Sequence, residues 1–214
     1  MEEKQDTEQL IINTAKRLFI EKGFDETSMS DVARKVGLNR PALHYYFRTK
    51  DKLFEAVFSI ILNAFVPKLR EIIMQPAPVS QRIEKIVNLY FGVLRQNPCL
   101  PLFLVREMQR KPDHLVSTVQ HLDTSGYIDI LKQTMLKEMD EGHMKKIPLE
   151  HVFYSFYGLM AIPFLTQSFV EVYTGKKIDE VQLDLWRQHV IDNLCNLLCT
   201  DKDAERTENN KKEQ

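Results

Sequence analysis

The stretch that decides the fold is Ser28-Met-Ser-Asp-Val-Ala-Arg-Lys-Val-Gly-Leu-Asn-Arg-Pro-Ala-Leu-His-Tyr-Tyr-Phe47, continued by Arg48-Thr-Lys-Asp-Lys-Leu53. Ser28 followed by Asp31 is typical of a helix N-terminus, and Val32 with Val36 forms an apolar pair one turn apart. Gly37 is the residue expected where a helix ends in a left-handed conformation. The first part therefore predicts a short helix that starts after Ser28 and ends at Gly37.

A second helix is predicted to begin two residues after that end. Asn39 is a good N-cap, and Pro41 lies in the first turn, where a missing N–H leaves no hydrogen bond unmade. This helix buries Leu43 and Phe47 and leaves an outer face of Arg40, Ala42, His44, Tyr45 and Tyr46. Two short helices joined by a glycine-containing turn form a helix-turn-helix, whose second helix enters the DNA major groove.

The charge of this region agrees with a nucleic-acid partner. Residues 34–52 contain six Lys and Arg residues and one acid, Asp51, for a net charge of +5, whereas the whole chain carries −1. Attraction to phosphates depends on the cations at the contact, so a local patch is sufficient. The alternative is a solvated basic face on an ordinary helix pair. The caps, the turn, the aromatic residues and the charge together favour the DNA-binding interpretation.

The same residues carry a family resemblance. The pattern Gly23-Phe24, Thr27-Ser28-Met29, Val32-Ala33 and the unbroken run from Val36 to Leu53 resembles the N-terminal domain of the TetR family of transcriptional regulators. The resemblance covers about the first quarter of the chain, and the remainder agrees in length and all-helical pattern. His44 stands where the family pattern has a tyrosine-like residue. Helix geometry and resemblance together predict these DNA-binding residues: Ser28, Met29, Ser30, Asn39, Arg40, Pro41, Ala42, His44, Tyr45, Tyr46 and Lys50.

Length and composition permit a small head and a larger body. The chain has 214 residues, of which 43% are hydrophobic, enough to bury a sizeable core. The richest apolar run, 153–164, is interrupted by Gly158 and Pro163 and falls short of the roughly 20 residues of a membrane span. The acidic N-terminus lacks the features of a secretory signal. We therefore expect a cytoplasmic protein without a membrane partner.

Cysteine and histidine usage gives no sign of a cofactor. Three cysteines cannot all pair within one chain, and Cys195 and Cys199 lie four residues apart, consistent with reduced thiols on one helix face. The six histidines show no metal-ligand spacing. We expect neither a metal nor another cofactor.

Hydrophobic residues recur every three to four positions almost throughout, which predicts an all-α chain. Beyond the helix-turn-helix, helices are expected at 7–22, about 50–74 with Thr49 as N-cap and a kink at Pro67, 80–96, 100–110, 113–141 with Gly126 as a weak point, 149–173 with a kink near Pro163, and 179–198. The predicted organisation is a three-helix DNA-binding head at 1–53, helix four as the link, a ligand-binding and dimerisation body at 75–200, and a disordered tail at 201–214.

The last two predicted helices are apolar over a wide arc, so each must bury two faces. One face can cover the body and the other can meet a symmetry mate in a four-helix interface with two-fold symmetry. The residues assigned to this homodimer interface are Phe156, Met160, Trp186 and Leu194. The alternative is that both faces are internal. The head favours a dimer, because one helix-turn-helix reads only one short half-site.

Large apolar residues with a few polar ones between them occur along the middle helices, which is the usual composition of a small-molecule site. The candidates for effector binding are Phe65, Phe91, Leu94, Phe103, Arg106, His121, Tyr127, Met135, Phe153 and Tyr157. For each apolar residue the alternative is ordinary core, and for each polar one an ordinary surface position.

The resemblance implies a ligand-responsive regulator, most simply a repressor that binds a palindromic DNA operator as a dimer and is released by a small, largely apolar molecule. Such a molecule must bind the DNA-free state better, since equal affinity for both states changes nothing. One alternative is a helical enzyme, but no nucleophile with a base, paired carboxylates or metal set is found. The other is a helical adaptor without DNA binding, against which Arg40, Tyr45, Tyr46 and Lys50 argue.

Overall fold

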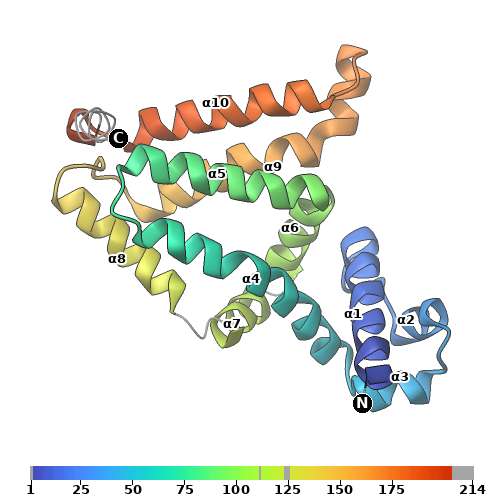
Figure 1. Cartoon of the computed structure of the whole chain (residues 1–214). Coiled ribbons are helices and arrows are strands. Elements are labelled where there is room, and N and C mark those ends of the chain that lie inside the picture. The colour runs from blue at the N-terminus through green and yellow to red at the C-terminus, as the bar shows by residue number, and fades with distance from the viewer. Residues whose placement is uncertain (1, 111, 123–125, 204–214) are drawn as a thin grey trace. The chain divides into compact units, whose positions relative to one another are not determined.

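The computed structural model describes residues 2–110, 112–122 and 126–203, which form an all-helical chain (Figure 1). Ten helices are labelled in these ranges: α1 (Glu2–Lys22), α2 (Met29–Val36), α3 (Arg40–Tyr46), α4 (Lys50–Met74), α5 (Val79–Gln96), α6 (Leu100–Arg110), α7 (Pro112–Leu122), α8 (Tyr127–Asp140), α9 (Leu149–Thr174) and α10 (Glu180–Leu198). The predicted all-α class is confirmed. None of the described helices is both long and apolar enough to cross a membrane.

The chain divides into two compact units. The first comprises Met1–Phe65 and Cys99–Thr124, and the second comprises Val66–Pro98 and Ser125–Gln214. Helix α4 begins in the first unit and ends in the second, and Pro67 lies just past the border. The sequence placed all of 75–200 in one body. The structure instead groups α6 and α7 with the helix-turn-helix.

The first unit is built around an aromatic cluster. Phe19 of α1 stacks on Phe24 with ring centroids 5.7 Å apart, and Phe54 of α4 meets Phe24 edge-on at 5.3 Å. Phe103 brings α6 to the same cluster, 5.7 Å from Phe54. Helix α1 packs against both α2 and α6. The helix-turn-helix is therefore supported by a core that includes a helix more than fifty residues away in the sequence.

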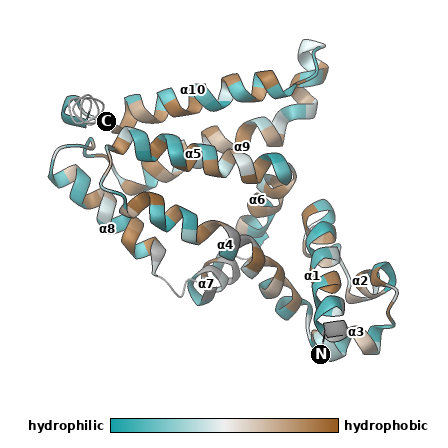
Figure 2. Ribbon diagram, in the orientation of Figure 1, coloured by the Kyte–Doolittle hydropathy of each residue, from teal (hydrophilic) through white to brown (hydrophobic). Residues whose placement is uncertain are grey.

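The second unit is centred on α5, which packs against α9 and α10 (Figure 1). Apolar and polar residues alternate along α5 and α10 in Figure 2, as expected of helices with one buried face. Val87 and Phe91 of α5 and Val190 and Leu194 of α10 are buried in this core.

Pro163 lies inside α9, and the carbonyl that it leaves without a helical partner has a specific donor in the fold. Proline lacks the N–H that would bond to the carbonyl four residues earlier, so Leu159 O has no helical donor. The indole Nε1 of Trp186, on α10, donates to that carbonyl at 2.9 Å. The α9–α10 pair is thus stabilised where α9 would otherwise be weakest.

The segment after α10 is ordered further than the sequence predicted. Residues 201–203 are helical, and Asp203 is completely buried. Its carboxylate accepts from Val79 N at 2.6 Å and from Ser80 N at 2.9 Å, at the start of α5. Because Pro78 offers no side-chain cap, Asp203 satisfies N–H groups that α5 leaves unbonded. The prediction of disorder from residue 201 is wrong for these three residues, and 204–214 lie outside the described part.

Two other helix predictions need correction. The single helix expected at 113–141 is two helices, because Gly126 adopts φ of +62° before α8 and α7 ends at Leu122. Left-handed backbone at Gly126 cannot continue a right-handed helix. Helix α1 begins at Glu2 rather than near residue 7. The expected cap of α4 is confirmed, since Thr49 Oγ1 accepts from Lys52 N at 3.1 Å.

Candidate nucleic-acid interface

Helix α2 begins with a complete capping box. The Ser28 hydroxyl oxygen accepts from Asp31 N at 3.1 Å, while Ser28 N donates to the Asp31 carboxylate at 3.2 Å. The Ser28 hydroxyl also donates to that carboxylate at 2.6 Å. These hydrogen bonds lower the pKa of Asp31 and keep it ionised, which suits the positive end of a helix dipole. The start of α2 is therefore fixed by local chemistry alone.

The turn between α2 and α3 is set by Gly37 and Asn39. Gly37 has φ of +82°, a conformation that glycine adopts without steric cost, and Leu38 N donates back to Ala33 O at 2.9 Å. Two residues later, Asn39 Oδ1 accepts from Ala42 N at 2.8 Å and starts α3. The two helices are thus joined in one defined geometry, as the sequence predicted.

The faces of α3 are as predicted. Leu43 and Phe47 are buried, while Arg40, Pro41 and Tyr45 are exposed, and Tyr45 exposes 70% of its surface. Ala42, His44 and Tyr46 are half-buried, and Asn39, Ser28 and Ser30 are exposed. Met29 differs from its expected role, since its side chain is buried in the unit. The remaining ten predicted contact residues keep some exposed surface.

Arg40 and His44 are linked on the outer side of α3. Arg40 Nε donates to His44 Nε2 at 3.3 Å, and His44 Nδ1 lies 3.0 Å from Arg48 O. Arginine can only donate, so Nε2 accepts and Nδ1 carries the proton that bonds to the Arg48 carbonyl. His44 thereby orients the Arg40 guanidinium. Arginine is the commonest reader of guanine in the major groove, so a fixed orientation matters for base selection.

Lys50 occupies the first position of α4, next to α3. Its Nζ donates to Phe24 O at 3.0 Å and lies 4.2 Å from the centroid of the Phe24 ring. An ammonium group carries three N–H donors, so the one bond to Phe24 leaves donors for an external acceptor. Lys50 is half-buried by these contacts.

The predicted effector residues are divided between the two units. Phe65, Phe103, Arg106 and His121 belong to the first unit, and Phe91, Leu94, Met135, Phe153 and Tyr157 to the second. Phe91, Leu94, Phe65 and Phe103 are buried, whereas Arg106 and His121 are exposed. The side chain of Tyr127 lies outside the described residues. Arg106 has a structural role that the sequence did not suggest, since its Nη1 donates to Lys22 O at 3.3 Å.

Of these candidates, Phe153 and Tyr157 are brought together on α9. Their ring centroids lie 4.6 Å apart, and the Tyr157 hydroxyl lies 3.4 Å from the hydroxyl of Tyr90 on α5. Tyr90 also meets Phe156 edge-on at 4.9 Å. Burial raises the pKa of Tyr157, so its phenol stays protonated. The result is a hydroxyl pair among aromatic rings within the second unit.

Of the four residues assigned to the dimer interface, two are buried in the single chain, whereas Phe156 and Trp186 are half-buried. Met160 and Leu194 expose 2% and 1% of their surfaces, so neither can meet a second copy. Trp186 donates to Leu159 O, and Phe156 packs on Tyr90. A different set is exposed on α9 and α10, named here the α9–α10 stripe: Tyr154, Ile162, Phe169, Val172, Tyr173, Val181 and Leu185.

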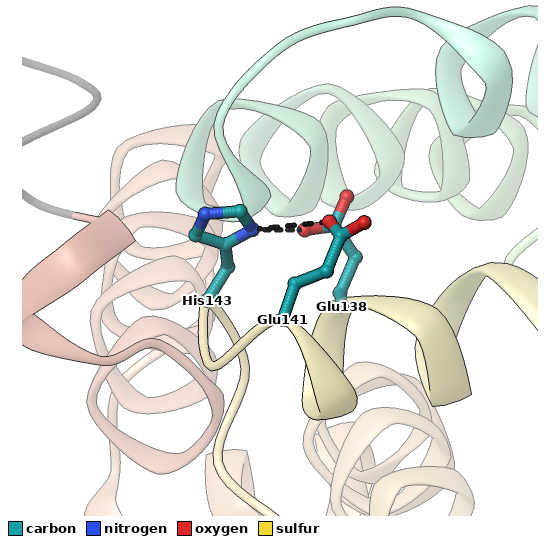
Figure 3. Close-up of side chains that lie close together, drawn as sticks. All are labelled: Glu138, Glu141 and His143. Atoms are coloured by element: carbon teal, nitrogen blue, oxygen red, sulfur yellow. Dashed lines mark hydrogen bonds and ion pairs between the residues drawn. The ribbon is translucent and has the colours of Figure 1, made fainter.

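One group of side chains within the described ranges could hold a metal ion: Glu138, Glu141 and His143, at the end of α8 (Figure 3). His143 Nδ1 lies 3.0 Å from Glu138 and 3.6 Å from Glu141. Glu138 also forms an ion pair with Arg82 of α5, and both side chains are largely buried. Because a guanidinium already neutralises Glu138, the cluster serves as a charge network that joins α5 to α8.

The sequence missed one link that the structure makes evident. Arg110, at the end of α6, places its guanidinium carbon 4.2 Å from the centroid of the same Phe24 ring that Lys50 contacts. No local pattern could have indicated this, because Phe24 and Arg110 are far apart in the chain and each alone is unremarkable in its segment.

Comparisons with known proteins agree with this geometry. Residues 11–57 match the family model of bacterial regulatory proteins of the tetR family. A probable HTH-type transcriptional regulator of Bacillus subtilis, YttP, is 25% identical over 174 residues, covering 78% of this chain and 81% of that protein.

Solved structures show the same fold. A tetR family transcription regulator from Shewanella sp. PV-4 superposes with a TM-score of 0.66 at 18% identity, covering 91% of this chain and 98% of that one. The regulator FadR from Bacillus subtilis, solved in complex with stearoyl-CoA, superposes with a TM-score of 0.65 at 19% identity, covering 87% and 96%. The helix-turn-helix with its basic flanks and the family match place a DNA-binding domain of the tetR family of bacterial regulatory proteins at residues 11–57, and the chain as a whole shares the fold of solved regulators of that family.

Proposed function

We propose that this regulator is a repressor that binds a palindromic operator as a homodimer and is released by a small, largely apolar effector. The observation that carries the proposal is the outer face of α3, where Arg40, His44 and Tyr45 are presented by a helix fixed at both ends. Arg40 and His44 are assigned to base edges. Lys50 and Tyr46, at the junction with α4, are assigned to phosphates.

The dimer is assigned to the α9–α10 stripe. On α9, Tyr154, Ile162, Phe169 and Val172 share one face at the helical period, and Gly158 on that face has open space above it. A wide apolar face of this kind is unusual on a monomer. A two-fold contact between two such faces forms a four-helix interface and gives two α3 helices that can occupy successive major grooves, about 34–36 Å apart.

The effector site is assigned to the second unit, with the Tyr90–Tyr157 hydroxyl pair as its polar end. Aromatic walls with one hydroxyl pair suit a ligand that is mostly apolar and carries a carbonyl or carboxyl group. The complex of FadR with stearoyl-CoA supports an acyl compound as the first class to test. Long-chain fatty acids and their coenzyme A thioesters are therefore the probes of choice.

The test is selection of duplexes from a random-sequence pool, followed by titration of the recovered operator with palmitate and palmitoyl-CoA. We expect an inverted repeat whose half-sites are centred about 10 base pairs apart. An effector should weaken operator binding by about 5- to 150-fold, the usual range of allosteric coupling. A single asymmetric half-site would contradict the dimer, and unchanged binding with every acyl probe would contradict the effector class.

Tyr157→Phe tests the effector site separately. It keeps the ring and removes the hydroxyl, so the response to the acyl probe should fall while operator affinity stays unchanged. Thr174→Val is the matched control, because it removes an exposed hydroxyl from the end of the same helix, outside the α9–α10 stripe. Equal responses from both variants would exclude the hydroxyl pair as an anchor.

A further inference from the structure

Two cations from different helices meet at one ring in the first unit. Lys50, from α4, and Arg110, from α6, each lie 4.2 Å from the centroid of Phe24. Phe24 itself is buried in the connection between α1 and α2. A cation within about 6 Å of an aromatic centroid is attracted by the ring's electron-rich face. Phe24 therefore joins α4, α6 and the segment that leads into the helix-turn-helix.

Arg110 is held rigidly at this ring. Its Nε and Nη2 lie 3.0 Å and 2.6 Å from Glu107 Oε2, one turn earlier on α6, and Glu107 is almost fully buried. Its Nη1 lies 3.7 Å from Asp25, the residue after Phe24. A planar guanidinium held at several points cannot rotate freely. The end of α6 is thus attached to the residues just before α2.

Lys50 is held at Phe24 by two contacts. Its ammonium donates to the Phe24 carbonyl at 3.0 Å in addition to contacting the ring. Arg110 carries the same charge at the same ring, so repulsion disfavours any rotamer that turns the Lys50 ammonium toward α6. The Phe24 carbonyl, the Phe24 ring and the Arg110 guanidinium together restrict the rotamers of the Lys50 side chain. A lysine side chain is otherwise among the most flexible.

We infer that Phe24 and Arg110 are positioning residues for DNA binding, which hold the Lys50 ammonium ready for a backbone phosphate. This inference rests on the proposed Lys50–phosphate contact. Ordering a long side chain before binding removes part of the entropy loss on association, which raises affinity without any new contact. Helix α6, outside the helix-turn-helix, would then contribute to operator affinity without touching DNA.

The variants that test this are chosen to leave no unpaired buried charge. Arg110→Gln is combined with Glu107→Gln, so that the carboxylate is neutralised together with its partner. The pair is made in the wild-type background and in Lys50→Ala. Arg106→Gln is the matched control, because Arg106 is on the same helix and binds the Lys22 carbonyl. Circular dichroism and thermal unfolding verify that each variant is folded.

The measurement is affinity for a random-sequence duplex between about 50 and 200 mM salt, where phosphate contacts dominate. Lys50→Ala should weaken binding and lower the slope of log K against log salt by about one. The glutamine pair should weaken binding about two- to tenfold with Lys50 present, the range expected for one side chain left unordered, and should have no effect in Lys50→Ala. Arg110→Lys keeps a cation at this position, so it should lose less duplex affinity than the glutamine pair.

The outcomes separate the inference from the function on which it rests. If wild-type protein binds no duplex, the proposed operator binding fails. If Lys50→Ala leaves affinity and slope unchanged, the Lys50 contact and the inference both fail while DNA binding stands. The inference is overturned if the glutamine pair lowers duplex affinity equally in the wild-type and Lys50→Ala backgrounds. It is also overturned if Arg106→Gln lowers affinity by the same amount. Either result would show a structural role only. Should the glutamine pair unfold, Phe24→Leu, which keeps the carbonyl but removes the ring, must show the same dependence on Lys50.

Discussion

Leu185→Glu should convert the proposed dimer into a folded monomer. Leu185 lies on α10 with 68% of its surface exposed in the single chain, within the α9–α10 stripe. A charge there costs the isolated chain little, because the side chain already faces solvent. In a two-fold interface the same carboxylate would be buried without a partner, and it would occur twice, once from each copy.

The size of the effect follows from the exposed fraction. Burying a whole leucine side chain contributes about 1.5–3 kcal/mol, so the exposed two thirds of Leu185 contribute about 1–2 kcal/mol per copy and about 2–4 kcal/mol per dimer. Desolvation of two carboxylates adds several kcal/mol more. A total of at least about 4 kcal/mol corresponds to a dimer weakened about a thousandfold.

Sedimentation velocity at micromolar concentration measures the mass, and circular dichroism establishes that the helices remain. Met74→Glu is the matched control, since Met74 is an exposed apolar residue of the second unit outside the stripe. Leu194→Glu provides the contrast, because a charge at a buried position should unfold the unit rather than separate two folded chains. A Leu185→Glu protein that sediments as a dimer and binds operator normally would refute the assignment of the stripe.

Three further predictions follow from single contacts. Asp203→Ala should lower the free energy of unfolding by about 2–4 kcal/mol in urea melts, because two buried N–H groups lose a charged acceptor. Asp201→Ala is the control and should change this free energy little, because Asp201 is exposed. Trp186→Phe should cost about 1–3 kcal/mol by leaving Leu159 O unbonded, and a value near zero would mean that water replaces the indole. Arg40→Ala should relax the preference at one symmetric base pair by about 1–3 kcal/mol in a random-site selection, and an unchanged consensus would make Arg40 a phosphate contact.

The helix-turn-helix was predictable because its determinants are local. Ser28, Gly37 and Asn39 act through bonds that span three to five residues, so their spacing in the sequence is nearly their geometry in space. The inward faces of α2 and α3 follow from the helical period alone. Fold class and the candidate DNA contacts therefore follow from the amino-acid sequence by itself.

What could not be predicted depends on which elements meet. The period shows that α9 and α10 are apolar on two faces, but only packing against α5 decides that Met160 and Leu194 point inward and that Leu185 points outward. Asp203 caps a helix that begins 124 residues earlier. Contacts of this kind have no signature in a single sequence, because neither partner alone is unusual.

Helix α4 shows how the two units depend on one continuous element. It begins at Lys50, which is fixed on Phe24, and its last turn is fixed where Arg82 Nη1 donates to Ile73 O at 3.2 Å. Arg82 is itself paired with Glu138 of α8, so a change in the second unit that moves α8 acts on the end of α4. Pro67 lies between these two attachments and removes one hydrogen bond from the helix. A helix that is fixed at both ends and lacks one hydrogen bond between them is expected to bend most easily near Pro67.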